Sequence, residues 1–518
     1  MTQRSPRFIL FALAFGVFVA ADDLTVVSTM LRQIVFDLEI PLPDGLDQAA
    51  WIVNAYLIAY VVVMPFTGKL SDLFGRKRIY LLSLILFLIG SIWVILPFNP
   101  LTEAFFEPSF RFFLTGRVIT AIGGGAMVPV SMAIIADIYS PQKRASALGI
   151  LGAIDTAGWV WGPLYGALLV RYLSWEWQFY LNIPLTILGI VLIVIALRDL
   201  EEPTATVQID WIGAALLTIC LLTLNIALLN SGDISAAGGF ADFETESKVS
   251  TTPLYLSALV SFVLFILYEQ RLERQGATPP LISPSLFKLP NFTPAILVNF
   301  IIGSTLIIAM VNVPLVINVL EFDVGGAAIT SGWLLSTMTG AMAVMAYVGG
   351  QWTERRNIRQ PTLAGLLGCT IGFALMGLLW ASTTPYSTMA WQLVILGVGF
   401  GLVTAPIGTA VINAAPDEAR GIASSLVIVM RLIGMSVGLS ALTAWGLYRF
   451  NILREQIQLP AIDDANYQNA LIQGLTDTTV ATLAETFLIS AVFVAIGFLV
   501  ALKLSSSANG QSYRHTDQ

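Results

Sequence analysis

The sequence predicts an all-α polytopic membrane protein. Of its 518 residues, 56% are hydrophobic and only 11% are charged, and the mean hydropathy is +0.79. Apolar stretches recur from end to end at the length of about twenty residues that a helix needs to cross the hydrocarbon core. The alternating polarity of membrane-spanning strands is missing, and a bilayer leaves the helix as the remaining way to satisfy the backbone. We therefore expect helices and exclude a β-barrel.

Fourteen spans of about twenty residues each can be drawn along the chain. The first apolar run, FILFALAFGVFVA, follows the basic segment MTQRSPR and resembles a signal peptide. Because no small-residue cleavage site follows it, we interpret it as the first span. The spans are expected to begin near residues 8, 49, 79, 112, 147, 177, 210, 253, 293, 329, 361, 388, 421 and 483.

The distribution of basic residues orients these spans. An even number of spans puts both termini on one side, and positive residues collect on the cytoplasmic side. With a cytoplasmic N terminus, six of the 26 Lys and Arg residues lie outside and two, Arg117 and Arg431, lie within spans. The sequence therefore predicts a multi-pass protein of the cell (plasma or inner) membrane with both termini in the cytoplasm. The six outside residues are Arg32, Arg111, Arg171, Lys248, Arg449 and Arg454.

Few residues are suited to enzymatic or metal chemistry. The single histidine, His515, lies in a polar tail, and Cys220 and Cys369 lie in separate apolar runs. This excludes a buried histidine and a disulfide framework. Neither HExxH nor GxSxG occurs. We expect no enzyme activity, no cofactor, no metal and no nucleic-acid partner.

Two charged hinges suggest an internal repeat. GKLSDLFGRKR follows the second span, and GQWTERRNIR follows the tenth with the same four-residue spacing between glycine and acid. Within the fifth span, Asp155 is followed by glycines three and seven residues later, and Arg431 in the thirteenth span is followed by glycines at the same distances. The repeated hinge and the repeated glycine spacing both predict two parallel six-span halves with two spans inserted between them.

This organisation divides the chain into four parts. The predicted parts are an N-terminal half at 1–200, two inserted spans with a cytoplasmic linker at 201–290, a C-terminal half at 291–505 and a polar cytoplasmic tail at 506–518. Residues near 447–482 keep helix formers at helical spacing on both sides of Pro460, which predicts two helices extended outward and joined by a turn.

These motifs resemble those of the major facilitator superfamily, and in particular its fourteen-span drug:proton antiporter group. The first hinge resembles the loop between spans 2 and 3 of that superfamily, GWVWGPLYGA its antiporter signature, and WEWQFYLNIP the start of span 6. Ala167 stands where a second glycine is usual, and Thr120 and Ala121 replace the Gln and first Gly of the family's span 4. The resemblance covers the whole chain and implies the major facilitator fold. It identifies Gly158, Gly162, Pro163 and Gly166 as the antiporter motif, which in the family resists proton leak.

The resemblance also assigns a role to the hinges. In the family the hinge carboxylate, here Asp72, caps a helix end in the opposite half and latches the outward-open state. A carboxylate at a helix N-terminus gains about 0.3–2 kcal/mol, which suits a latch that opens in every cycle. The alternative is that the hinge only fixes the turn and the topology. The expected gating residues are Gly68, Asp72, Gly75, Arg76, Gly350 and Glu354.

An acidic pair in the first span is the expected proton site. Asp23 and Arg117 fall at similar depth in the outer half of spans 1 and 4, and intramembrane charges usually pair and face a cavity. We predict that Asp23 is the proton-coupling carboxylate and that Arg117 favours its charged form. The alternative is a static ion pair that fixes helix contacts. Asp22 points about 100° away along the helix and ranks second.

Two further charges are expected near the membrane midplane. Asp155 and Arg431 are equivalent by the repeat, so they lie at equal depth, and an unpaired charge there would cost several kcal/mol. We predict that they pair in one state of a rocking cycle. The alternatives are that Arg431 pairs with Asp23 or binds an anionic lipid headgroup.

A narrower resemblance concerns the cargo. WGPLYG, RLIGMSVG and LTAWGLYRFN, with the outward extension, resemble the mycobacterial triacylglycerol exporters that work with a lipid-carrying lipoprotein. The implied function is a proton-coupled secondary active exporter of hydrophobic or lipidic molecules that works by alternating access, with triacylglycerol-like lipids favoured and an extracytoplasmic lipoprotein as a possible partner. The alternatives are a multidrug:proton antiporter and, more distantly, a transport-like sensor.

Overall fold

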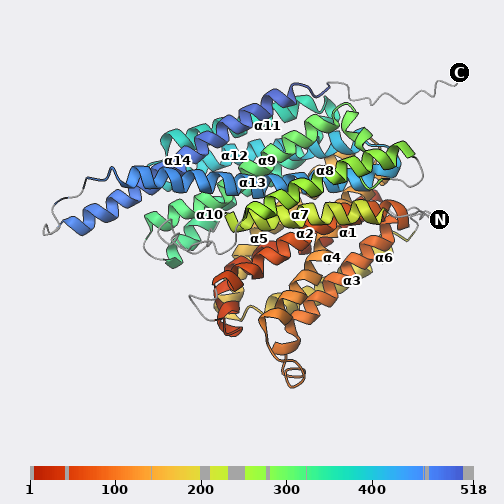
Figure 1. The fold of residues 1–518 in the computed structure, drawn as a ribbon, viewed down its shortest axis with the longest axis horizontal. Coiled ribbons are helices and arrows are strands. Elements are labelled where there is room, and N and C mark those ends of the chain that lie inside the picture. The colour runs from red at the N-terminus through yellow and green to blue at the C-terminus, as the bar shows by residue number, and fades with distance from the viewer. Residues whose placement is uncertain are drawn as a thin grey trace.

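The fold is a bundle of long helices, seen in a computed structural model (Figure 1). The structure describes residues 5–40, 46–141, 143–198, 210–231, 251–275, 280–321, 324–458, 460 and 466–505. Each of the fourteen predicted spans is found as a helix in this part of the chain, which confirms the predicted fold class. The helices are α1 (Pro6–Asp37), α2 (Leu46–Phe74), α3 (Arg76–Ile95), α4 (Phe110–Ile138), α5 (Arg144–Tyr172), α6 (Trp177–Ala196), α7 (Trp211–Ser231), α8 (Thr252–Gln275), α9 (Phe292–Leu320), α10 (Val324–Arg355), α11 (Arg359–Leu379), α12 (Tyr386–Ala414), α13 (Arg420–Arg454) and α14 (Tyr467–Ala501).

Length and composition suit these helices to a membrane. Within the described residues, thirteen helices are long and apolar enough to cross it, and α5, which carries Asp155 and several glycines, is the exception. Successive helices alternate in direction, so α2, α4 and α10 end, and α5 and α13 begin, where α1 begins. We call this the terminal end of the bundle. Gly75 lies there between α2 and α3 at φ 99°, a left-handed conformation that glycine adopts without strain.

The helices pack as two repeats. In α1–α6, α5 packs along α1, and in α9–α14, α13 packs along α9. Across the seam between the halves, α5 meets α10 and α2 meets α13. The inserted helices α7 and α8 pack on each other, and α7 also touches α2 and α13, so the inserted pair covers one side of this seam (Figure 1). Only 22% of the apolar window of α8 is buried, which leaves this helix facing lipid.

Two helices are much longer than a bilayer requires. Both α13 and α14 contain 35 residues. At a rise of 1.5 Å per residue each is about 52 Å long, against a hydrocarbon core of about 30 Å. Their connected ends project beyond the other helices in Figure 1.

Several predicted features fall outside the described residues. They are the start of the inserted segment at 201–209, the loop at 232–250, the centre of the turn in the extension at 461–465, and the tail at 506–518 with His515.

Candidate functional site

The predicted acidic site brings together α1, α2, α4 and α6. Arg117 Nη1 of α4 lies 2.8 Å from Asp23 Oδ2, and Arg117 Nη2 donates to the backbone oxygen of Asp23 at 3.3 Å. Asp23 is 0% exposed and Arg117 is 1% exposed. The guanidinium also lies over the ring of Tyr56, 4.1 Å from its centroid, which adds a cation–π contact. Losing one partner of such a buried pair typically costs about 3–5 kcal/mol, so the two side chains hold each other in place.

Two amides of α6 complete this site, and sequence reasoning did not find them. Asn182 donates to Asp23 Oδ1 at 3.0 Å, and Gln178 donates to Asp22 Oδ2 at 3.2 Å. Gln178 also donates to Asn182 at 3.3 Å, and both amides are buried. Their spacing of four residues within an apolar helix was the available signal, because it puts both amides on one face. The two acids of α1 are thus held by one connected network.

The antiporter-motif glycines bring α5 against the same turn of α1. A Cβ on Gly158 would lie 2.7 Å from Ala21 Cβ and 3.2 Å from Asp22 N. A Cβ on Gly162 would lie 2.9 Å from Asp22 O, so neither position has room for a side chain. Gly166 is buried further along α5, which also contains Pro163, a residue whose side chain is outside the described set. The motif therefore supports the backbone that carries Asp22 and Asp23.

The midplane charges form an ion pair across the seam. Arg431 Nη2 of α13 lies 3.2 Å from Asp155 Oδ2 of α5, and both side chains are largely buried. The pair borders a small pocket between the two halves, with a cavity volume of about 20 Å³. The pocket is lined by Asp155, Thr156, Trp159, Leu306, Met310, Thr339, Met342 and Arg431. Apart from the ion pair and two threonines, this lining is apolar.

Exchanging the two midplane charges tests their pairing. Asp155→Arg and Arg431→Asp are each expected to abolish transport, because each leaves two like charges at one buried seam. The double variant with both substitutions should recover at least part of the transport rate, since opposite charges then face each other again. Transport in liposomes containing equal amounts of folded protein measures this. A double variant as inactive as the single variants would contradict the pairing.

At the terminal end, Asp72 of α2 caps the first turn of α13. Its carboxylate accepts hydrogen bonds from Gly421 N at 2.9 and 3.0 Å and from Ile422 N at 3.2 Å. The two helices cross closely, because a Cβ on Gly68 would lie 2.5 Å from Gly421 O. A carboxylate on the free amides of a helix N-terminus also interacts favourably with the helix dipole. This contact joins the two halves.

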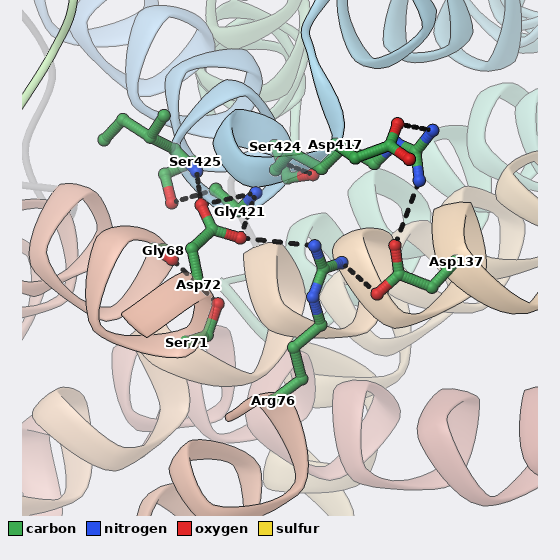
Figure 2. A network of polar contacts seen from close by, with 11 residues as sticks. Gly68, Ser71, Asp72, Arg76, Asp137, Asp417, Gly421, Ser424 and Ser425 are labelled. Carbon is green, nitrogen blue, oxygen red and sulfur yellow. Dashed lines mark hydrogen bonds and ion pairs between the residues drawn. The ribbon is translucent and has the colours of Figure 1, made fainter. Parts of the chain in front are cut away.

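Figure 2 shows how an ion-pair network surrounds this cap. Arg76 of α3 bridges Asp72 at 3.2 Å and Asp137 at 2.8 Å, and Arg420 lies 3.2 Å from Asp137. Arg420 also pairs with Asp417. Asp137, at the end of α4, thus holds an arginine from each half. Sequence reasoning missed Asp137, since nothing in its own segment repeats or spaces it as a partner of the hinge.

The second hinge makes a matching contact. Glu354 Oε1 of α10 accepts a hydrogen bond from Ser146 N, in the first turn of α5, at 3.0 Å. Gly350 lets the helices approach, because a Cβ there would lie 2.9 Å from the carbonyl carbon of Ala145. Arg144 adds a 2.9 Å hydrogen bond to Asn413 of α12. Each half therefore supplies a carboxylate that caps a helix of the other half, and the terminal end is closed twice.

Loss of the first cap should favour opening of this end. Asp72→Asn removes the carboxylate charge and is expected to cost the closed state about 0.3–2 kcal/mol, which shifts the ratio of open to closed molecules by up to about thirtyfold. Spin labels on Arg78→Cys and Arg356→Cys, exposed positions at the terminal end of α3 and α10, report the separation by electron–electron resonance. Glu418→Gln, an exposed change beside α13, is the control. Unchanged distances in Asp72→Asn would remove the latch role.

An ion pair joins α13 and α14 at the base of the extension. Arg449 Nε of α13 lies 2.9 and 2.8 Å from the two oxygens of Glu485 in α14. Further out, Ser382 of the α11–α12 loop donates to Asp477 of α14. A Cβ on Gly474 would lie 2.7 Å from Ile457 Cγ2, so the chain beyond α13 packs back on α14. In the described part of the chain, no group of three His, Cys, Asp or Glu side chains is arranged to hold a metal ion.

Comparison with known proteins matches this architecture. The family described as Major Facilitator Superfamily matches residues 13–439. A protein named probable triacylglyceride transporter from Mycobacterium leprae is 31% identical over 520 residues, covering 98% of this chain and 97% of that protein. Multidrug resistance protein 3 of Bacillus subtilis is 30% identical over 460 residues, covering 88% and 82%. A solved proton:xylose symporter shares the fold with a TM-score of 0.58 at 13% identity, covering 95% of each chain. With the family matched across most of its length, the chain belongs to the major facilitator superfamily.

Proposed function

We propose that this transporter is a proton-coupled secondary active exporter of hydrophobic and lipidic molecules, with triacylglycerol-like lipids as the favoured cargo. The observation that carries the coupling is the fully buried Asp23–Arg117 pair, whose carboxylate is the natural place for a proton to compete with a guanidinium. The cargo class rests on the relative named triacylglyceride transporter, which aligns with nearly the whole chain.

Alternating access accounts for the arrangement of charges. Asp72 and Glu354 close the terminal end, while the Asp155–Arg431 pair lies deeper at the same seam. A proton on Asp23 weakens its attraction to Arg117, and α4 also packs against α13 of the other half. Proton binding is thereby linked to movement of one half against the other, as a rocking carrier requires.

The lining of the seam suits an apolar cargo such as a lipid. The pocket beside Asp155 is mostly apolar, but its cavity volume of about 20 Å³ is far below the volume of common ligand sites, about 300–1,000 Å³. A triacylglycerol is larger than this pocket, so it would enter with its acyl chains still in lipid or in a more open state. The projecting ends of α13 and α14 then give an insoluble molecule a path away from the membrane.

Orientation follows from the charge distribution of the loops. We assign the terminal end to the cytoplasm, both termini included, and the extension to the outer side of the cell membrane. An extracytoplasmic lipid-carrier lipoprotein is the partner that this orientation allows. The two caps at the terminal end, made by Asp72 and Glu354, then correspond to the cytoplasmic gate in its closed state.

Multidrug:proton antiport is the second candidate. It is favoured by the 30% identity to Multidrug resistance protein 3 of Bacillus subtilis and by the antiporter motif on α5. Drugs and lipids both require an apolar cavity, so the pocket lining by itself does not separate them.

Flux against an imposed proton gradient tests the proposal. Proteoliposomes should move a fluorescent triacylglycerol faster when the proton gradient is present, and collapse of the gradient with an ionophore should remove the difference. A lipophilic cationic dye in parallel assays measures drug export. Gradient-driven flux of the dye alone would favour the second candidate, and flux of neither would refute a proton-coupled exporter of these molecules.

A further inference from the structure

The inserted helices carry two acidic residues that the transport cycle described above does not use. Asp210 directly precedes α7 and Glu269 lies near the end of α8, so both are at the terminal end of the bundle. Asp210 is 6% exposed and Glu269 is 1% exposed. Buried carboxylates of this kind need a partner, because burial of an isolated charge costs several kcal/mol.

Both carboxyl groups converge on one glycine. Asp210 Oδ1 accepts a hydrogen bond from Gly213 N at 2.8 Å, which caps α7. A Cβ on Gly213 would overlap both Asp210 Oδ2 and Glu269 Oε1. Within the described residues, both oxygens of Glu269 and Asp210 Oδ2 lack a hydrogen bond of good geometry, although the amides of Leu281 and Ile282 face Glu269 and the hydroxyl of Tyr268 faces Asp210. Three acceptor atoms of the two carboxyl groups therefore lie close together in a buried place.

The charged and polar groups around this place are few. Lys69 of α2 and Tyr268 of α8 act electrostatically on both acids, and Arg271 acts on Tyr268. Backbone amides of Leu281 and Ile282 face Glu269 from the linker, and Asp72 acts on Lys69 from one turn away.

We propose that Asp210 and Glu269 form a proton-binding site, separate from Asp23, in which the two carboxyl groups share one proton. Two buried carboxylates this close repel each other, and a single proton between them removes one charge and joins the two groups by a hydrogen bond. A metal ion fits less well, because Lys69 already supplies a positive charge and two carboxyl groups are a small ligand set.

Lys69 connects this site to the cytoplasmic latch. Lys69 and Asp72 are three residues apart on α2 and therefore lie on one face of the helix. α2, which carries Lys69, packs on α7, which begins next to Asp210. While Asp72 caps α13 and holds the end of α2 in place, the positive charge of Lys69 favours the deprotonated form of the acid pair. Release of the latch moves the end of α2 and weakens that effect, so the pair binds a proton more tightly. By linkage, proton binding at Asp210 and Glu269 favours the open latch.

Distance measurements at two pH values test the link to the latch. We use the full-length protein in lipid nanodiscs, with Cys220 and Cys369 replaced by Ala and spin labels on Arg78→Cys and Arg356→Cys. Acid should lengthen the distances, and the double variant Asp210→Asn, Glu269→Gln should show a clearly smaller shift, because Asp23 and Asp72 remain. Glu273→Gln changes a half-buried acid one turn along α8 that accepts a hydrogen bond from Ser285 N, and it should retain the shift. A shift of unchanged size in the double variant, or no shift in the parent protein, would overturn the proposal.

Infrared spectroscopy tests the proton itself. Glu269→Gln should remove one protonated-carboxyl signal from the pH difference spectrum, whereas Glu273→Gln should not remove that signal. A spectrum unchanged by Glu269→Gln would mean that the pair does not titrate and would refute the site. Asp23→Asn should keep this signal, so this site can stand even if proton-coupled transport through Asp23 fails.

Discussion

Replacing Asp23 by Asn should abolish gradient-driven transport and leave ligand binding intact. Asn has the size of Asp and can still accept a hydrogen bond from Arg117, but it cannot take up a proton. The coupled flux in proteoliposomes is therefore expected to fall to the level of empty liposomes. Ligand affinity, measured by a fluorescence titration, should change little, because Asp23 is fully buried and does not line the pocket at Asp155.

The controls separate proton coupling from a structural role. Asp37→Asn changes an acid on the same helix that accepts a 2.7 Å hydrogen bond from Trp175 and is far from Arg117 along α1. It should keep most of the coupled flux. Asp22→Asn should give an intermediate loss, since it weakens only the contact with Gln178. If Asp23→Asn transported at the parent rate under the same gradient, the carboxylate could not be the coupling site.

The helices and the repeat were predictable from local sequence properties. Span length follows from bilayer thickness, so each apolar run gave one helix. The spacing of glycines after Asp155 and Arg431 also translated directly into packing. Gly158 and Gly162 meet α1 in the way that Gly434 and Gly438 meet α9, because a period of three and four residues places small side chains on one helix face. Because Asp155 and Arg431 lie at equal depth in the repeat, their side chains are within contact distance.

Contacts between segments that are far apart in the sequence could not be predicted from local sequence properties. Nothing in α6 specifies that Asn182 points at Asp23 and not at lipid, because helix rotation depends on neighbouring helices. The same holds for Asp137, whose place between Arg76 and Arg420 depends on how α4 ends against both halves. Asp210 and Glu269 were missed for a further reason. Both lie at helix ends, where acids are usually solvated, and only the fold of the inserted pair buries them.

Removing the outer extension should reduce lipid export selectively. Deletion of residues 451–479, bridged by a short Gly/Ser segment, removes the projecting parts of α13 and α14 and leaves the Arg449–Glu485 ion pair to join the two helices below. An insoluble lipid loses its path beyond the membrane surface, whereas the cationic dye carries a charge and can pass directly into water. We expect flux of a fluorescent triacylglycerol to fall by about tenfold or more, equivalent to at least about 1.4 kcal/mol in the barrier to release.

Dye export and a full-length control make this result interpretable. Asp477→Asn weakens the contact of the extension with Ser382 but keeps its length, so it should retain most of the lipid export. The deletion variant must elute as a single species and unfold at a temperature close to that of the parent protein. If lipid and dye export both fall, the extension only stiffens the outer gate, because a gate serves every cargo. Lipid export at the parent rate in the folded deletion variant would show that the extension plays no part in releasing the lipid.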